Sequence, residues 1–316
     1  MSIPALIRAV YAVPQSAAQT MLTIFTVCVV ALLVAPPATS RRPALESHEV
    51  WLQAATAAYT TGQAIEQSEV LLVVPGLATG SECVSLSKAA RQCAVELGGQ
   101  GAASSADLGA QPTGRIPSIA SAAIAQKHGL ECPVALPDEA DRIVDSLLMR
   151  VFELIDTQHP SIVSTLFGPA ADSMLGLHRD GALNYHSREP AVNVYDTGGE
   201  FLPHMDHEAL TVLIPLTSPS PAAATQSGTA GFSGGGTGFW SLEQAPNARG
   251  GQAPTALLRP EAGTALIFGG HLMHAGLPVN TGTRVCFVAS FSAFSYDYDF
   301  WGPRPRPASL YKHAGV

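Results

Sequence analysis

Short apolar runs closed by glycine, proline or polar turns fill the second half of the chain. After about residue 190 these runs are rich in valine, isoleucine, leucine and phenylalanine, and none is as long as an ordinary helix. Runs of this length and composition favour strands, because strands are short and accept β-branched and aromatic side chains well. The predicted strands cover residues 192–195, 210–214, 264–268 and 284–291.

The first half of the chain has the wider spacing that is typical of helices. After Pro137, apolar residues recur every three or four positions and acidic residues occupy the first turn, which predicts a helix. Further helices are predicted over 45–69 and from Ser81 onward, and a strand over 71–74 is closed by Pro75-Gly76. Segments 98–117 and 218–236 are rich in small residues and predict loops.

This order of elements predicts a mainly β protein with supporting N-terminal helices. Helices followed by many short strands favour a single sandwich or barrel. We divide the chain into a leader over 1–44, a helical N-terminal region with a first strand over 45–189, a barrel core over 190–295 and a tail over 296–316.

An apolar segment in the leader bears on where the protein works. Residues 21–34 carry no charge, but a spanning helix needs about 20 apolar residues. The segment also suits the apolar part of a signal peptide, and arginines lie on both sides of it, so charge fixes no orientation. A membrane anchor, a signal and a buried leader all stay open. The first two imply the secretory pathway or the endoplasmic reticulum membrane, and the third implies the cytoplasm.

Composition narrows the classes of partner. The formal net charge is −8 with only three lysines, so the clustered cations that bind phosphate backbones are missing and we expect no nucleic-acid partner. Apolar residues make up 47% and charged residues 13%, so the chain can bury a sizeable core. Of the five cysteines, Cys28 lies in the apolar segment, and the other four are either disulfide-bonded or free thiols.

Two H-x-D tripeptides are candidates for chemistry. His178-Arg-Asp180 matches the catalytic loop of protein kinases, but no asparagine follows at the required spacing, so we interpret it as structural. His204-Met-Asp206 lies among predicted strands, where residues i and i+2 face the same side, so both side chains can bind one metal ion.

A third metal ligand must come from another strand. His274 follows the apolar run that ends at Phe268, and its spacing to Arg284 favours it over the alternative, His271. Two imidazoles and one carboxylate leave three coordination positions open, which is typical of non-haem Fe(II) oxygenases. Two of these positions suit a bidentate 2-oxo acid and the third suits dioxygen.

Two further side chains are candidates for the co-substrate. Arg284 begins the last predicted strand and offers a permanently charged, bidentate partner for a carboxylate. Tyr195, nine residues before His204, is either a hydrogen-bond donor to the same carboxylate or an ordinary strand aromatic. We expect Cys286 to be a small core residue, and Gly234-Gly-Gly236 to be a turn because no G-K-[ST] follows it.

Several of these segments resemble one known family. Residues 193–206 contain a tyrosine, a Gly-Gly turn and H-x-D; 232–240 resembles a G-G-x-T-x-F turn; 263–268 and 274–284 resemble a distal-histidine segment that ends in a basic residue; and 71–86 resembles the family's N-terminal strand and helix start. The family that these segments resemble is the prolyl 4-hydroxylase branch of the 2-oxoglutarate/Fe(II) oxygenases. The likeness is strong over 190–292, looser over 70–190 and absent elsewhere. It departs at the insert over 217–234, and some family members have lysine in place of Arg284.

The resemblance implies a double-stranded β-helix, a jelly-roll-like barrel. It implies Fe(II) bound by His204, Asp206 and His274, and 2-oxoglutarate bound by Arg284 and Tyr195. The implied activity is a dioxygenase that hydroxylates an unactivated C–H, releases succinate and CO2, takes peptidyl proline as the leading substrate and uses ascorbate as reductant. A related oxygenase acting on a small metabolite, a non-catalytic metal-binding barrel that serves as a binding module, and a zinc hydrolase remain alternatives. The sequence does not indicate an oligomeric state.

Overall fold

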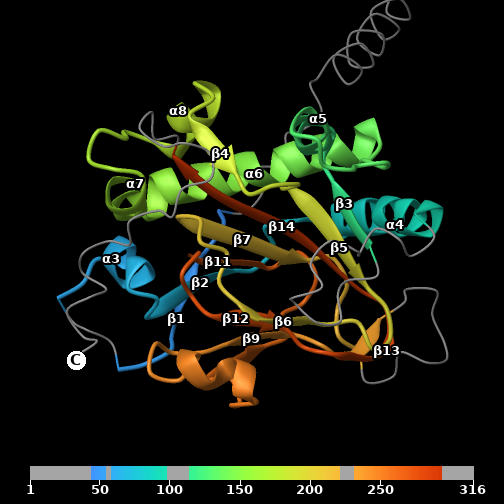
Figure 1. Ribbon diagram of the computed structural model, residues 1–316. Helices are drawn as coiled ribbons and strands as arrows, with labels where there is room; N and C mark the ends of the chain where they lie inside the picture. The colour runs from blue at the N-terminus through green and yellow to red at the C-terminus, as the bar shows by residue number, and fades with distance from the viewer. Residues whose placement is uncertain (1–43, 55–57, 98–113, 221–230, 294–316) are drawn as a thin grey trace, which may run out of the picture. The chain divides into compact units, whose positions relative to one another are not determined.

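The computed structural model describes residues 44–54, 58–97, 114–220 and 231–293, whose helices and strands are shown in Figure 1. The apolar segment 21–34 and the tail over 296–316 lie outside these residues. No helix within the described ranges is long and apolar enough to cross a membrane. In chain order the elements are β1 (His48–Trp51), α3 (Thr61–Glu66), β2 (Val70–Val74), α4 (Gly80–Glu96), β3 (Gly114–Pro117), α5 (Ile119–Lys127), α6 (Asp138–Gln158), α7 (Pro160–Leu166), α8 (Met174–Arg179), β4 (Leu183–Tyr185), β5 (Ala191–Tyr195), β6 (Phe201–His204), β7 (Leu210–Pro215), β8 (Phe232–Gly234), β9 (Thr237–Phe239), the 3-10 helix η2 (Ala245–Gly250), β10 (Ala256–Leu258), β11 (Ala265–Gly269), β12 (His274–Gly276), β13 (Val279–Gly282) and β14 (Arg284–Ala293).

Antiparallel strands dominate the fold, as predicted. An eight-stranded sheet has the order β1-β2-β11-β7-β14-β5-β3, with β4 pairing the far end of β14. A four-stranded sheet has the order β10-β9-β12-β6, and β13 pairs β8 separately. The described strands thus form distinct sheets rather than one closed barrel. The strands predicted over 71–74, 192–195, 210–214, 264–268 and 284–291 are confirmed as β2, β5, β7, β11 and β14.

Alternation along β14 separates the two faces of the large sheet. Val285, Phe287 and Ala289 belong to the main hydrophobic cluster, which also contains the buried side of α6. The alternate side chains of Arg284, Cys286 and Val288 line a pocket on the opposite face. Because successive strand residues point to opposite faces, one strand both supports the core and supplies the site.

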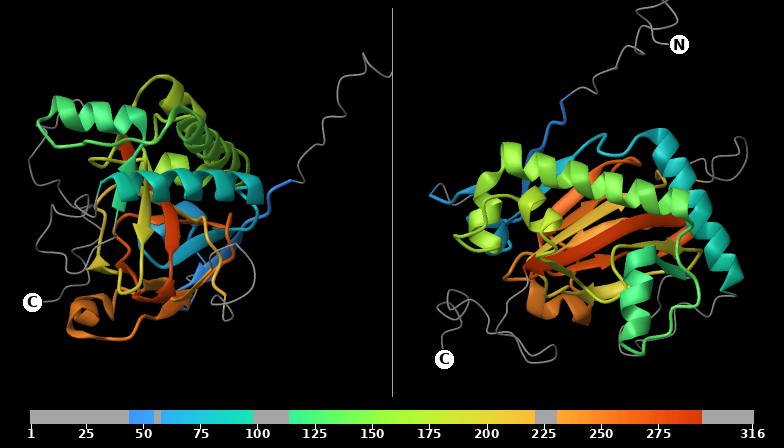
Figure 2. Two further views of the ribbon diagram at one scale, coloured as in Figure 1. Left: turned by 90° about the vertical axis from the view of Figure 1, so that its right-hand side faces the viewer. Right: turned by 90° about the horizontal axis from the view of Figure 1, so that it is seen from above.

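Helices cover the first of these faces, and Figure 2 shows α6 lying across the strands when viewed from above. The predicted helix after Pro137 is confirmed, and its buried residue Phe152 meets Phe291 of β14 edge to face at 5.5 Å between ring centroids. The helix predicted from Ser81 is also confirmed as α4. Glu82 closes its capping box on Thr79 and accepts hydrogen bonds from Arg150 of α6, at 2.9 Å from Nη2, so the two helices are tied together.

The helix predicted over 45–69 is wrong. Residues 48–51 instead form β1, paired with β2 from His48 opposite Val73 to Trp51 opposite Val70. Among the described residues of this segment, the helix is limited to Thr61–Glu66. The loose apolar spacing of this segment fits either period, and pairing with the buried strand β2 decides in favour of a strand. The loop prediction over 98–117 is wrong for its last four residues, because Gly114–Pro117 forms β3 against β5, and residues 98–113 lie outside the described residues.

Candidate active site

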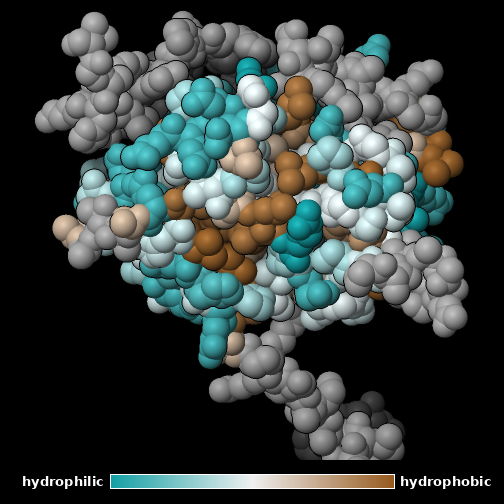
Figure 3. Space-filling view, turned by 90° about the horizontal axis from the view of Figure 1, so that it is seen from below, coloured by the Kyte–Doolittle hydropathy of each residue, from teal (hydrophilic) through white to brown (hydrophobic). Residues whose placement is uncertain are grey.

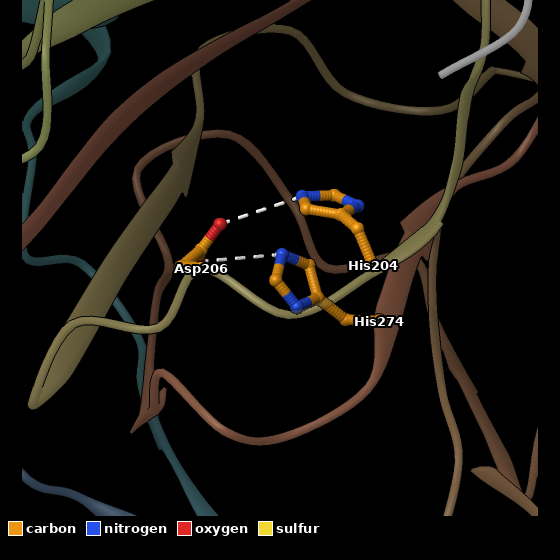
Figure 4. Close-up of side chains that lie close together, drawn as sticks. All are labelled: His204, Asp206 and His274. Carbon is orange, nitrogen blue, oxygen red and sulfur yellow. Dashed lines mark ion pairs between the residues drawn. The ribbon is translucent and has the colours of Figure 1, made fainter. Parts of the chain in front are cut away.

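His204, Asp206 and His274 come together between the two sheets (Figure 4). His204 ends β6 and His274 begins β12, and these two residues are direct partners in the antiparallel pair. Asp206 follows β6, and its Oδ1 and Oδ2 lie 3.4 Å and 3.5 Å from Nε2 of His204 and His274. One potential ligand atom from each residue lies within 4.8 Å of the other two, which is close enough for all three to bind one ion.

Backbone carbonyl groups orient both imidazoles. Nδ1 of His204 lies 2.8 Å from the carbonyl oxygen of Leu202, and Nδ1 of His274 lies 2.9 Å from that of Leu272. A ring that donates its Nδ1–H to a carbonyl keeps the lone pair on Nε2, the atom that faces Asp206. The same tautomer in both rings therefore presents two nitrogen ligands to one point.

The surroundings of His274 and Asp206 favour the protonation states in which these two side chains bind a metal. Burial lowers the pKa of His274 to about 4, against the opposing effect of Asp206, so its ring is neutral near pH 7. Burial alone would raise the pKa of Asp206. The charge of His274, the hydrogen bond and charge of His204, and the hydrogen bond that the Thr211 hydroxyl donates to Oδ2 at 2.6 Å hold that pKa below its usual value instead.

His271, the alternative third ligand, is not part of this group. It lies in the turn before β12, and its ring is 6.1 Å from that of His207. Within the described ranges, His204, Asp206 and His274 are the group of histidine, cysteine and carboxylate side chains close enough to share an ion. The other H-x-D is also separate: His178 lies in α8 with its ring 5.3 Å from Phe152, and Asp180 pairs with Arg179 at the surface.

The triad opens into a pocket of about 590 Å³ lined by both sheets. Arg284 lies in its wall, only 2% exposed, and Nη2 donates to the Thr237 hydroxyl at 2.9 Å. Gly276 leaves room for the guanidinium, since a Cβ there would lie 3.2 Å from Nη1. A buried guanidinium facing a pocket is a natural partner for a carboxylate.

Thr237 was not singled out as a site residue from the sequence. The only available signal was its place in the G-G-x-T-x-F segment. The structure puts its hydroxyl beside Arg284, and Thr237 also lines the pocket.

Tyr195 lines the same pocket, but its hydroxyl already has a neighbour. The hydroxyl oxygen lies 3.3 Å from Nδ2 of Asn193, and Arg284 Cζ lies 5.4 Å from the centre of the tyrosine ring. Burial raises the pKa of Tyr195 to about 12, so the phenol keeps its proton. Contact between this hydroxyl and a co-substrate stays a prediction.

The cysteines in the described part of the chain form no disulfide. The four cysteines within the described ranges, Cys83, Cys93, Cys132 and Cys286, are buried free thiols. Cys286 lines the pocket, and burial raises its pKa, which keeps the thiol protonated.

On the outside, Figure 3 shows a patch of apolar side chains on the face that carries β9 and η2 in Figure 1, surrounded by polar ones.

No family model matches the sequence, and no curated protein matches it. Similar solved structures include prolyl hydroxylases and a 2OG-Fe(II) oxygenase family protein. A viral collagen prolyl hydroxylase of Paramecium Bursaria Chlorella virus-1, in its 2OG complex, is 15% identical over 71% of this chain and 96% of its own, with a TM-score of 0.42. A Pseudomonas putida prolyl-4-hydroxylase is 12% identical over 71% and 93%, with a TM-score of 0.43. A Burkholderia pseudomallei oxidoreductase of the 2OG-Fe(II) oxygenase family is 15% identical over 46% and 56%, with a TM-score of 0.29. At these values the site geometry, and not the likeness, carries the functional argument.

Proposed function

We propose that the protein is an Fe(II)- and 2-oxoglutarate-dependent dioxygenase that hydroxylates an unactivated C–H and releases succinate and CO2. The observation that carries this proposal is one pocket with two features: a buried His-Asp-His group, and a buried arginine, Arg284, in the wall. We further propose that the two facing sheets correspond to a double-stranded β-helix core. Peptidyl proline is our leading prime substrate, and ascorbate the reductant.

The donor set suits iron. Two imidazoles and one carboxylate form the 2-His-1-carboxylate set associated with non-haem Fe(II), and the pocket leaves space beside it for further ligands. Bound Fe(II), together with dioxygen and 2-oxoglutarate, would supply the oxidising power for C–H hydroxylation. A zinc hydrolase would need a general base beside the metal. Glu189, the only carboxylate besides Asp206 among the pocket residues, is already engaged by Arg115 and by the backbone N–H of Ser290 at 2.6 Å.

The chain's own groups divide the remaining tasks. Arg284 would bind the distal carboxylate of 2-oxoglutarate, and its hydrogen bond to Thr237 fixes the direction of the guanidinium before the co-substrate arrives. The carbonyl groups of Leu202 and Leu272 hold the imidazoles in place. Phe201, Leu213 and Val288 give part of the pocket an apolar wall that limits water near the reacting atoms.

An anaerobic titration of the full chain with Fe(II) and 2-oxoglutarate tests the proposal. We expect a weak visible charge-transfer band of the iron chelate, followed by succinate when oxygen is admitted. Iron binding with neither band nor succinate would instead support the alternative, a metal-binding module without turnover. Tight zinc binding with oxygen-independent hydrolysis would support a hydrolase.

A further inference from the structure

Asn193 is a buried amide in the pocket lining that the proposed metal and co-substrate sites do not use. It is 5% exposed and lies in β5, where its register partners are Cys286 of β14 and Arg115 of the edge strand β3. All three side chains line the pocket. They therefore form a row that leads from the central strand β14 to the edge of the large sheet.

One end of this amide has no partner in the described part of the chain. Nδ2 lies within hydrogen-bonding distance of the Tyr195 hydroxyl, whereas Oδ1 is fully buried and accepts no hydrogen bond. Buried polar atoms in folded proteins are nearly always satisfied, because leaving one unpaired costs about 1–3 kcal/mol. An unpaired acceptor on a residue that lines the pocket therefore points to a ligand that supplies a donor when it binds.

The two neighbouring guanidinium groups donate to acceptors other than Oδ1. The Arg115 guanidinium pairs with Glu189, and Glu189 is itself held by the backbone N–H of Ser290. Arg284 donates to Thr237. 2-Oxoglutarate, with two carboxylates and a ketone, carries only acceptors at neutral pH, so it cannot satisfy Oδ1. Between the two ligands of the pocket, only the prime substrate can therefore supply a donor to Oδ1.

The charges around Asn193 specify what kind of donor fits. A buried ammonium group needs an anionic partner. The carboxylates among the pocket residues are Glu189, which pairs with Arg115, and Asp206, which belongs to the triad. A neutral N–H or O–H carries no such requirement.

We propose that Asn193 is a specificity-determining residue that accepts a hydrogen bond from a neutral N–H of the prime substrate, of the kind an amide group carries. This inference rests on the proposed function and narrows its substrate class. It favours capped or internal peptide segments and other amides over free amino acids, whose ammonium group would be buried without a counter-ion.

The test compares Asn193→Leu, which keeps the side-chain size and removes both polar atoms, with Asn280→Leu, the same change at an exposed position of β13. The probes are a library of N-acetylated, C-amidated proline tripeptides and a mixture of free amino acids. Succinate release is measured with and without each probe. Binding of the tripeptides that stimulate release is also measured by calorimetry on Zn(II)-loaded protein with 2-oxoglutarate.

We expect the capped library, and not the free amino acids, to stimulate the wild type. Asn193→Leu should weaken tripeptide binding and raise the KM for the tripeptide by about tenfold, the effect of one lost hydrogen bond. The KM for 2-oxoglutarate in turnover without added probe should stay unchanged, and Asn280→Leu should change neither value.

Four outcomes would overturn the inference: a raised KM for 2-oxoglutarate, equal stimulation of Asn193→Leu and wild type, stimulation by free amino acids alone, or no stimulation by the capped library. In each case the iron–2-oxoglutarate band and basal succinate release would persist. Loss of both in the wild type would instead mean that the proposed function itself is wrong.

Discussion

His204 and His274 stand directly opposite each other in the antiparallel pair of β6 and β12, with ring centroids 4.3 Å apart. Their spacing is therefore set by strand register, and neither ring depends on a long loop for its position. Sites built on paired strands hold their ligands more precisely than sites on loops, which suits a centre that must keep open coordination positions.

The triad predicts which histidine is needed for iron. Asp206→Ala and His274→Ala should each abolish iron binding and succinate release, because either change leaves only two protein ligands. His271→Ala should bind iron like the wild type, since His271 lies outside the group. Iron bound per chain after desalting, with succinate measured by chromatography, tests all three variants. Loss of iron in His271→Ala with retention in His274→Ala would reverse the assignment.

Arg284→Ala should raise the KM for 2-oxoglutarate by about 10- to 100-fold, because it removes a charge-assisted hydrogen-bonding partner from a buried site. Iron binding without 2-oxoglutarate should be unaffected. Arg179→Ala is the matched control, since the side chain of this arginine is 78% exposed on α8 and pairs with Asp180. Initial rates over a range of 2-oxoglutarate concentrations measure the effect. An unchanged KM in Arg284→Ala would mean that the carboxylate binds elsewhere.

Thr211→Val should weaken iron binding by about tenfold while the fold stays intact, because the Thr211 hydroxyl orients Asp206 through a 2.6 Å hydrogen bond. Thr283→Val makes the same chemical change at a hydroxyl that donates to Asp196 at 2.8 Å, outside the pocket. Competition with a coloured Fe(II) chelator gives both affinities. Equal affinities in the two variants would show that Asp206 does not need this support.

The contact between α4 and α6 predicts a pH-dependent stability. Burial alone would raise the pKa of Glu82, but hydrogen bonds from Thr79 and Arg150 and the charge of Arg150 lower it to about 2, below its ordinary value of 4.5. A carboxylate with a depressed pKa stabilises the fold fully above its ordinary value and loses that effect as the pH falls toward the depressed one.

Glu82→Gln should therefore lower the free energy of unfolding by about 1–2 kcal/mol near pH 7, after allowance for solvent screening of a partly exposed pair. The difference from wild type should shrink as the pH falls below about 4.5. Urea denaturation at a series of pH values measures it, and Glu96→Gln, at an exposed position near the end of the same helix, should behave like the wild type. A difference that stays constant down to pH 3.5 would contradict the assignment.

Strand positions could be predicted where the local sequence leaves no choice. The runs that became β5, β7, β11 and β14 are buried and β-branched, so both propensity and pattern favour strands. The segment 45–69 could not be predicted in this way. Its apolar residues fit a helix loosely, and β1 forms only because β2 offers a partner strand. Pairing across a sheet is a tertiary effect that a single segment does not encode.

The candidate site also has features that the local sequence encodes and features that depend on tertiary contacts. The H-x-D spacing predicts that His204 and Asp206 share one side of a strand, and the order of segments suggests His274 and Arg284. In the structure His204 ends β6 and Asp206 lies just after it. The direction of the Tyr195 hydroxyl toward Asn193 could not be predicted, because it depends on two neighbouring strands and on the packing of Arg284 over the ring. The unpaired state of Asn193 Oδ1 likewise could not be predicted, because it depends on which residues surround this atom in the folded protein.

The position of β14 has a consequence for how the protein is made. Residues 284–293 form β14, which lies between β7 and β5 in the large sheet. Both β7 and β5 are therefore synthesised before the strand that pairs with them. Until then, β7 and β5 expose unpaired hydrogen-bonding edges, and such edges invite association between chains. We therefore expect the large sheet to close only once β14 has been synthesised, because both β7 and β5 need it as a partner.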